Sequence, residues 1–232
     1  MNGEWILIGL AVLGVVSFVL GAFWLAAYFE RKKREALAAA AAELGLSFYP
    51  EKTYETATRF HFLDKLDAGA NRYAQYVMRG VYEGYAVVVF EYHYETYSHS
   101  KNGRQTHHHY LSVFVAELGA SFPEVVVARE GVLSKIAQAF GYDDIDFESH
   151  EFSRKYCVRS ADKRFAYDVC NPQMIEFLLA HPHIEFEIEG SSLAVVFGGR
   201  ISPDRIHPGV AQACGAASKL PRYLFERVGQ HA

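Results

Sequence analysis

The chain has 232 residues, half of them apolar, and a net charge of −4. So apolar a composition excludes a disordered chain, and its 3 cysteines exclude a disulfide-rich secreted scaffold. The mild acidity disfavours a nucleic-acid binder, which normally carries a basic surface, so no nucleic-acid partner is expected. The length suits one medium-sized domain, or one domain plus an anchor.

A long apolar segment begins the chain. Residues 5–29 carry no charge, and as a helix they would span ~37 Å, enough to cross a ~30 Å hydrocarbon core. Trp5 lies at one edge, with Trp24 and Tyr28 at the other, as is typical of aromatic rings at the two membrane interfaces. A cleaved signal peptide is disfavoured, because the run is too long and no basic residue precedes it. Residues 1–29 are therefore predicted to form a transmembrane anchor.

The charges beside the anchor predict its orientation. Four basic residues follow the apolar run and none precedes it: Arg31, Lys32, Lys33 and Arg34. The positive-inside rule places this side in the cytoplasm and the N-terminus outside, as expected for a bacterial inner-membrane protein. The basic cluster is also positioned to contact anionic headgroups of the lipid bilayer. Ser17 and Gly21 have a small-xxx-small spacing, which offers a route to a homo-oligomer.

Two further segments follow the anchor. Residues 30–45 are mostly strong helix formers that end at Gly45, which predicts a basic, alanine-rich helical stalk. The stalk either continues straight out of the bilayer or packs on the domain, and the sequence leaves both open. Residues 46–232 are predicted to form a cytoplasmic domain.

The first half of this domain is predicted to be a three-stranded antiparallel meander. Strands are expected over 76–82, 85–97 and 106–117, with turns at Glu83-Gly84 and Asn102-Gly103. A two-residue turn at Asn102-Gly103 would pair Val88 with Glu117. By the strand period of two, Glu91, His93, Glu95 and His99 would then point away from the apolar face.

The second half is predicted to be mixed. Helices are expected over 132–140, over 172–180 and from Ser202 to Val228, with Pro208 and Pro221 kinking or dividing the last one. A short strand is expected over 156–159, and Gly190 is expected to turn a hairpin between 184–189 and 193–197. The fold class is thus predicted as α+β, an antiparallel meander and hairpin covered by helices on one side.

An acidic stretch is the main candidate metal site. In an extended chain, four potential ligands would share one face, and oxygen ligands suit hard cations: Asp144, Asp146, Glu148 and His150. The stretch lacks the glycine and distal glutamate of a calcium loop, so a purely structural loop is the competing interpretation.

The hairpin histidines are the second candidate. Glu95, His99 and His108 are expected to converge near the turn, whereas His107 and His109 face away from His108. Solvent-exposed polar side chains at a hairpin tip are the competing interpretation.

No catalytic motif is evident. His150-Glu151 begins like a zinc-protease helix, but Arg154 stands where the second histidine should be. Cys157, Cys170 and Cys214 have apolar neighbours and are expected to be inert buried thiols. No catalytic residue and no cofactor is assigned, and enzymatic activity is disfavoured without being excluded.

Two sequence patterns resemble a group of uncharacterised bacterial membrane-anchored proteins. They are Leu44-Gly45-Leu46 with Phe48 and Pro50, and Phe140-Gly141 with residues 144–147, Phe152-Ser153 and Tyr156. The resemblance implies a bacterial membrane-anchored protein and supplies no activity.

The sequence therefore predicts a single-pass inner-membrane protein whose cytoplasmic domain is a protein-interaction or assembly module with a partner of unknown identity. The alternative is a divalent-metal sensor or metal-dependent enzyme that uses residues 143–150 or the hairpin histidines.

Overall fold

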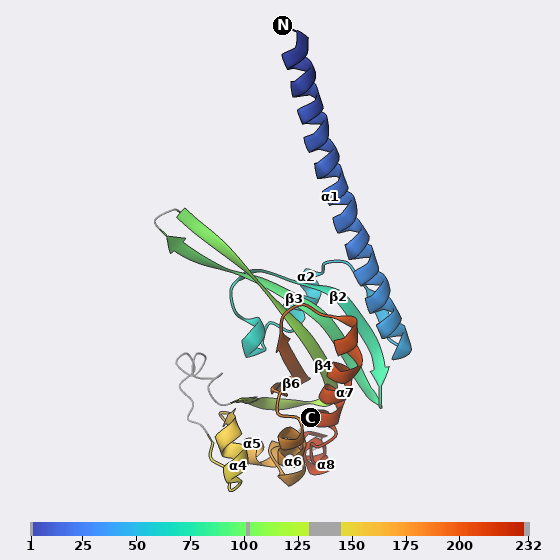
Figure 1. Cartoon of the computed structure of the whole chain (residues 1–232). Helices are drawn as coiled ribbons and strands as arrows, with labels where there is room; N and C mark the ends of the chain where they lie inside the picture. Colours follow the sequence, from blue (N-terminus) through green and yellow to red (C-terminus); the bar gives the residue numbers. More distant parts are fainter. Residues whose placement is uncertain (1, 101–102, 130–144, 230–232) are drawn as a thin grey trace.

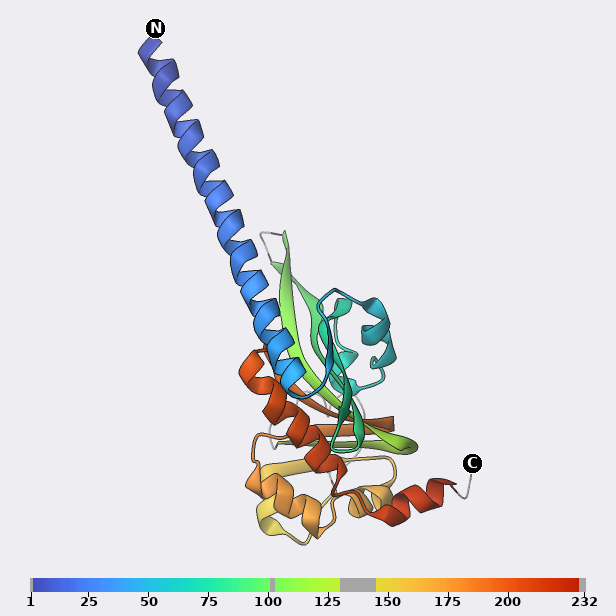
Figure 2. The same cartoon turned by 90° about the vertical axis from the view of Figure 1, so that its right-hand side faces the viewer.

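One uninterrupted helix, α1 (Asn2–Glu43), contains the apolar segment, the basic cluster and the stalk. The computed structural model describes residues 2–100, 103–129 and 145–229. Among these, α1 is the helix long and apolar enough to cross a membrane, which suggests membrane anchoring. Beyond its end, Gly45 adopts a φ of +69° and the Leu46 amide donates to the Ala41 carbonyl, as expected of a glycine cap. Figures 1 and 2 show α1 projecting from the domain.

The α+β prediction is confirmed. A six-stranded antiparallel sheet has the order β1-β2-β3-β4-β5, with β6 pairing to β4. The strands are β1 (Ser47–Tyr49), β2 (Ala70–Tyr82), β3 (Tyr85–Ser100), β4 (Gly103–Arg129), β5 (Tyr156–Arg159) and β6 (Phe186–Gly198).

The meander formed by β2, β3 and β4 is present, but its predicted register is wrong by two residues. Val88 pairs with Val115 and not with Glu117, and Ser100 pairs with Gly103. Gly103, predicted to be a turn residue, is thus the first residue of β4, and Asn102 lies outside the described residues. A shift of two leaves every side chain on its predicted face, because the strand period is also two.

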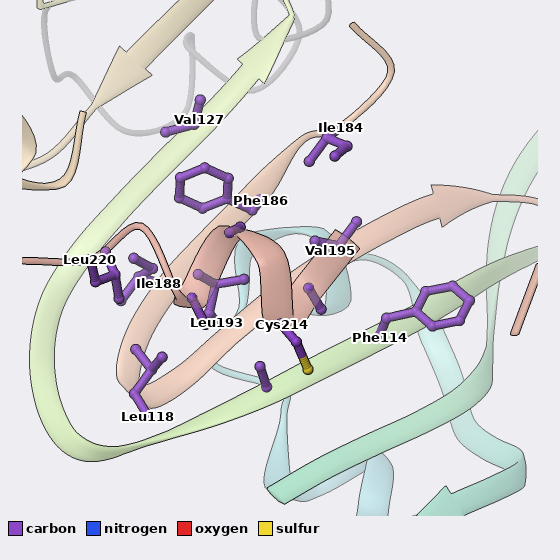
Figure 3. Packing of buried hydrophobic residues seen from close by; sticks show 14 of the residues in the cluster. Phe114, Leu118, Val127, Ile184, Phe186, Ile188, Leu193, Val195, Cys214 and Leu220 are labelled. Carbon is purple, nitrogen blue, oxygen red and sulfur yellow. The ribbon is translucent and has the colours of Figure 1, made fainter. Parts of the chain in front are cut away.

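The predicted hairpin at Gly190 is wrong. Residues on both sides of Gly190 belong to one strand, β6, which pairs with β4 from Val127–Phe186 to Leu111–Gly198. The pairing is irregular near Gly190, whose φ is +56°. Because β4 runs on to Arg129, it offers a pairing edge along all of β6, and Gly190 serves as a bend. Figure 3 shows both ribbons turning near Leu118.

Helices cover both faces of the sheet and not one face as predicted. On one face, α2 (Tyr54–Arg59) and the 3₁₀ turn η1 (Asp64–Leu66) pack over Phe90 and its neighbours. On the other face, α1 and α7 (Pro203–Ala217) pack over Phe114. The reason is that β3 carries apolar side chains on both of its faces, with Val87 and Val89 on one and Val88 and Phe90 on the other.

The stalk packs on the domain. Leu37 and Ala41 of α1 are fully buried in the core that contains α7 and the sheet. Figure 2 shows the C-terminal part of α1 lying against α7. The open choice between a free and a docked stalk is thus settled by the apolar face of residues 37–41.

Four short helices lie around the second half of β4: α4 (His150–Lys155), α5 (Lys163–Val169), α6 (Pro172–Ala180) and α8 (Arg222–Gly229). The predictions of α6 and β5 are confirmed, and Pro221 divides α7 from α8 as expected. The helix predicted over 132–140 lies outside the described residues. Cys170 and Cys214 are buried and Cys157 is partly buried, and burial raises the pKa of Cys214 to about 11.

Candidate functional site

A fully buried carboxylate marks the place where α1 meets the sheet. Glu91 of β3 has no exposed surface. Its Oε2 accepts hydrogen bonds from Lys33 Nζ of α1 at 3.2 Å and from the Ile201 amide at 2.9 Å, and its Oε1 accepts from the Gln75 side chain at 2.5 Å. Arg200 Nη1 lies 3.5 Å from Oε1. A buried charge is tolerated when it is paired and hydrogen-bonded in this way, so Glu91 ties α1, β2 and the segment before α7 to β3.

A second contact lies beside the Glu91 group. The Tyr76 hydroxyl of β2 donates to Glu30 of α1 at 2.5 Å, and Lys33 Nζ lies 4.4 Å from the centre of the Tyr76 ring. Burial first, and then the hydrogen bond to Glu30, raises the pKa of Tyr76. Tyr76 also has a φ of +54°, at an irregularity in the β2–β3 pairing. The stalk part of α1 is thus joined to the domain by both polar and apolar contacts.

The predicted basic cluster divides into two pairs. Lys33 faces Glu91, and Arg34 bonds Glu30 and Glu51 at 3.0 Å each. The side chains of Arg31 and Lys32 are 67% and 56% exposed, pair with the exposed Glu35 and lie over the Tyr28 ring. Arg31 and Lys32 are therefore the members of the cluster whose exposure suits headgroup contact.

The aromatic side chains predicted to lie at the end of the apolar segment near the basic cluster are also wholly or partly exposed. Trp24 and Tyr28 stack with ring centres 5.8 Å apart, and Trp24 is 69% exposed. The side chain of Trp5 lies outside the described ones.

Three potential metal ligands meet at the base of the β3–β4 hairpin. His93 Nε2 lies 3.1 Å from His108 Nδ1, which lies 3.4 Å from Glu95 Oε1. Among the described residues, these three form the one group of possible ligands that lie within 4.8 Å of one another. His99, predicted to belong to this group, pairs instead with Arg104 nearer the tip. His93 takes the place that was predicted for His99. The observed register explains this difference, because it places His108 opposite Glu95, next to His93 and away from His99.

The other hairpin histidines face away, as predicted. His109 stacks on Tyr94 on the opposite face, with ring centres 4.7 Å apart. His107 lies 2.9 Å from the Ser98 hydroxyl, also on that face.

Surrounding groups set the protonation states of this cluster. His93 is buried beside Tyr73 and Tyr110, with ring centres at 4.4 and 5.0 Å. Burial lowers the pKa of His93, which favours the neutral imidazole. The Asn71 side-chain amide donates to Glu95 Oε1 at 2.8 Å and lowers the pKa of Glu95, which favours the carboxylate.

The acidic stretch is arranged differently. Asp146, Glu148 and His150 are all exposed, and Asp144 lies outside the described residues. The Asp146 carbonyl accepts a hydrogen bond from Tyr167 at 3.1 Å, and His150 is the first residue of α4. Glu148 lies beside a cavity of about 690 Å³ between this stretch, α5 and α6. A metal at this stretch stays a prediction.

The sequence interpretation missed Glu30, Gln75, Tyr76 and Glu91 as a group. Glu91 was assigned to an outward face, whereas α1 covers it. The available signal was its position two residues beyond Val89 on the same face of β3, inside an apolar strand.

The comparisons with known proteins identify a fold. No family model matches the chain, and no curated protein matches its sequence. Among solved structures, the chain is similar to the mycobacterial trehalose monomycolate transport factor A, TtfA, with a TM-score of 0.58 and 13% identity. The likeness covers 82% of this chain and 95% of that one. At this identity, it establishes a shared architecture.

Proposed function

We propose that this chain is a single-pass bacterial inner-membrane protein whose cytoplasmic domain helps to assemble a transport complex in the cell envelope. The observation that carries the proposal is the docking of α1. The Lys33–Glu91 ion pair and the buried Leu37 make the anchor and the domain one unit. An enzyme with a soluble substrate could work on a loose tether, whereas a module that contacts another membrane protein benefits from a fixed orientation.

Two further observations support the proposal. The solved structure with the same architecture is a transport factor by name. The patterns around Leu44 and Phe152 resemble bacterial membrane-anchored proteins without an assigned activity. In this proposal the N-terminus is outside, and Arg31 and Lys32 lie at the cytoplasmic headgroups.

Site-specific crosslinking in the native bacterium tests the assembly role. A photoreactive amino acid at Tyr97, an exposed residue of the β3–β4 hairpin, should give one defined adduct with another membrane protein. The same probe at Tyr167, an exposed residue of α5 that contacts Phe147, is the matched control and should not give that adduct.

A second variant connects the adduct to docking. Leu37→Asp places a charge in the interface between α1 and the domain and should abolish the Tyr97 adduct while the chain stays in the membrane fraction. An adduct that survives Leu37→Asp would contradict the proposal. So would activity of a reporter enzyme fused to the C-terminus, if that enzyme works only outside the cytoplasm.

A further inference from the structure

The group at the hairpin base has the dimensions of a coordination sphere. Zinc binds histidine nitrogen and carboxylate oxygen at ~2.0–2.2 Å, and tetrahedral geometry then separates neighbouring ligand atoms by ~3.3 Å. The separation from His108 Nδ1 is 3.1 Å to His93 Nε2 and 3.4 Å to Glu95 Oε1. Two of the three separations therefore match the edges of a zinc tetrahedron, and all three ligand atoms lie within 4.8 Å of one another.

The hydrogen-bond chemistry of the group also leaves room for a cation. His93 Nδ1 lies 3.3 Å from the Asn71 carbonyl, which can only accept, so the ring proton belongs on Nδ1 and Nε2 presents a lone pair. Glu95 presents a carboxylate oxygen. Without a cation, the single proton on His108 Nδ1 would have to be shared between two acceptors, His93 Nε2 and Glu95 Oε1. A divalent cation would satisfy all three electron pairs at once, with the His108 proton on its other ring nitrogen.

Asn71 positions two of the three side chains. Its carbonyl orients the His93 ring and its side-chain amide holds Glu95 Oε1. The Tyr97 hydroxyl donates to Glu95 Oε2 at 3.0 Å. Hydrogen bonds from a second layer to histidine and carboxylate ligands are a regular feature of metal sites, because they fix the tautomer and the ring orientation.

We propose that His93, Glu95 and His108 bind one Zn²⁺ ion at the base of the β3–β4 hairpin. The mixed nitrogen and oxygen set suits zinc better than magnesium or calcium, which prefer oxygen ligands alone. The His108 side chain is 53% exposed, so a water molecule or a group from outside can reach the fourth position. Zinc would cross-link β3 to β4 where the hairpin leaves the domain. This site lies on the same hairpin as the proposed assembly contact, but zinc binding by the purified chain needs no partner, so each proposal can fail without the other.

Zinc titration of the full-length chain in detergent tests the proposal. The chain is purified with a tag that contains no histidine, stripped with a chelator and titrated with ZnCl₂ by calorimetry. We expect one ion per chain. His108→Ala and Glu95→Gln should each weaken zinc binding by at least about 10-fold, as losses of metal-site groups commonly do.

His107→Ala is the matched control, because it removes the adjacent histidine from the opposite face of the same strand. It should leave zinc affinity unchanged. The Co²⁺ form of the wild type should also show the visible absorption of a tetrahedral site, and His108→Ala should lose it. Absence of saturable zinc binding in the wild type, or equal losses in His107→Ala and His108→Ala, would overturn the proposal.

Discussion

The Glu91 carboxylate shows how one residue decides where the anchor docks. A buried carboxylate without a cation costs several kcal/mol, and Lys33 supplies that cation from 58 positions earlier in the chain. Arg200, Gln75 and the Ile201 amide share the carboxylate, so loss of Lys33 alone leaves Glu91 only partly compensated.

Lys33→Met should therefore lower the free energy of unfolding by about 1–3 kcal/mol, the usual cost of leaving a buried polar group short of a partner. Lys32→Met is the matched control. Lys32 is exposed and pairs with an exposed glutamate, so its loss should change stability by less than about 0.5 kcal/mol. Thermal unfolding of the full chain in micelles, followed by circular dichroism, measures both. Equal effects would show that Lys33 stabilises the fold no more than a surface lysine.

At the same scale, the sequence predicted which side chains of β3 share a face and missed that helices cover both faces. The period of two put His93, Glu95 and His108 on one face whether or not the turn was located correctly, but the register error led to His99 and not His93 as the third member of the group. The apolar residues around Glu91 indicate that its face of β3 is covered, but they do not identify the covering element, because Lys33 lies in a helix distant in sequence.

At the level of elements, local signals predicted the pieces that are bounded by strong caps or breakers. Asn171 and Pro172 begin α6 as expected, and the Asn171 side chain accepts from the Gln173 and Met174 amides. The prediction of a hairpin turn at Gly190 was wrong because glycine is favoured both in hairpin turns and at bends within a strand. The distinction lies in β4, which pairs with β6 on both sides of Gly190, from Leu111 to Val127. Long-range pairing therefore overrode a local turn signal.

The contact between α7 and the sheet gives an element-scale prediction. A Cβ built on Gly209 would lie 2.4 Å from the ring of Phe114, which is buried and packed edge-on against Phe197. Gly209→Ala should therefore force α7 away from β4 and destabilise the protein by about 1–3 kcal/mol, despite the better helix propensity of alanine.

Gly215→Ala in the same helix is the control. Its Cβ would lie 3.1 Å from Phe177, so a small shift of that ring suffices. Higher helix propensity offsets the shift, and the net change should stay within about 1 kcal/mol. Urea denaturation of the two variants checks the difference. A Gly209→Ala protein as stable as the wild type would mean that α7 packs against Phe114 more loosely than the 2.4 Å approach indicates.

For the whole molecule, α1 and the β3–β4 hairpin leave the domain on the same side. In Figures 1 and 2 the end of the hairpin reaches the level of the middle of α1. From Glu91, beside Lys33, β3 continues to Ser100 over roughly 30 Å. Residues 96–116 contain no aspartate or glutamate and include Arg104. The middle of α1 belongs to the apolar segment, so we expect the hairpin end to reach the headgroup layer when that segment is in a bilayer, with Arg104 near anionic headgroups.

A depth measurement in proteoliposomes tests this geometry. An environment-sensitive label is attached at His99→Cys in a Cys157→Ser background, in which Cys170 and Cys214 are buried. Lipids with a spin label on the headgroup should strongly quench the label at 99, because the docked anchor holds the hairpin against the membrane surface. Lys163→Cys, at the start of α5 on the far side of the domain, should not be quenched. Combining His99→Cys with Leu37→Asp should abolish the quenching, since an undocked helix no longer sets the height of the hairpin. Equal quenching at 99 and 163 would mean that the domain lies on the membrane in some other orientation, and the rigid docking of α1 would then have to be abandoned.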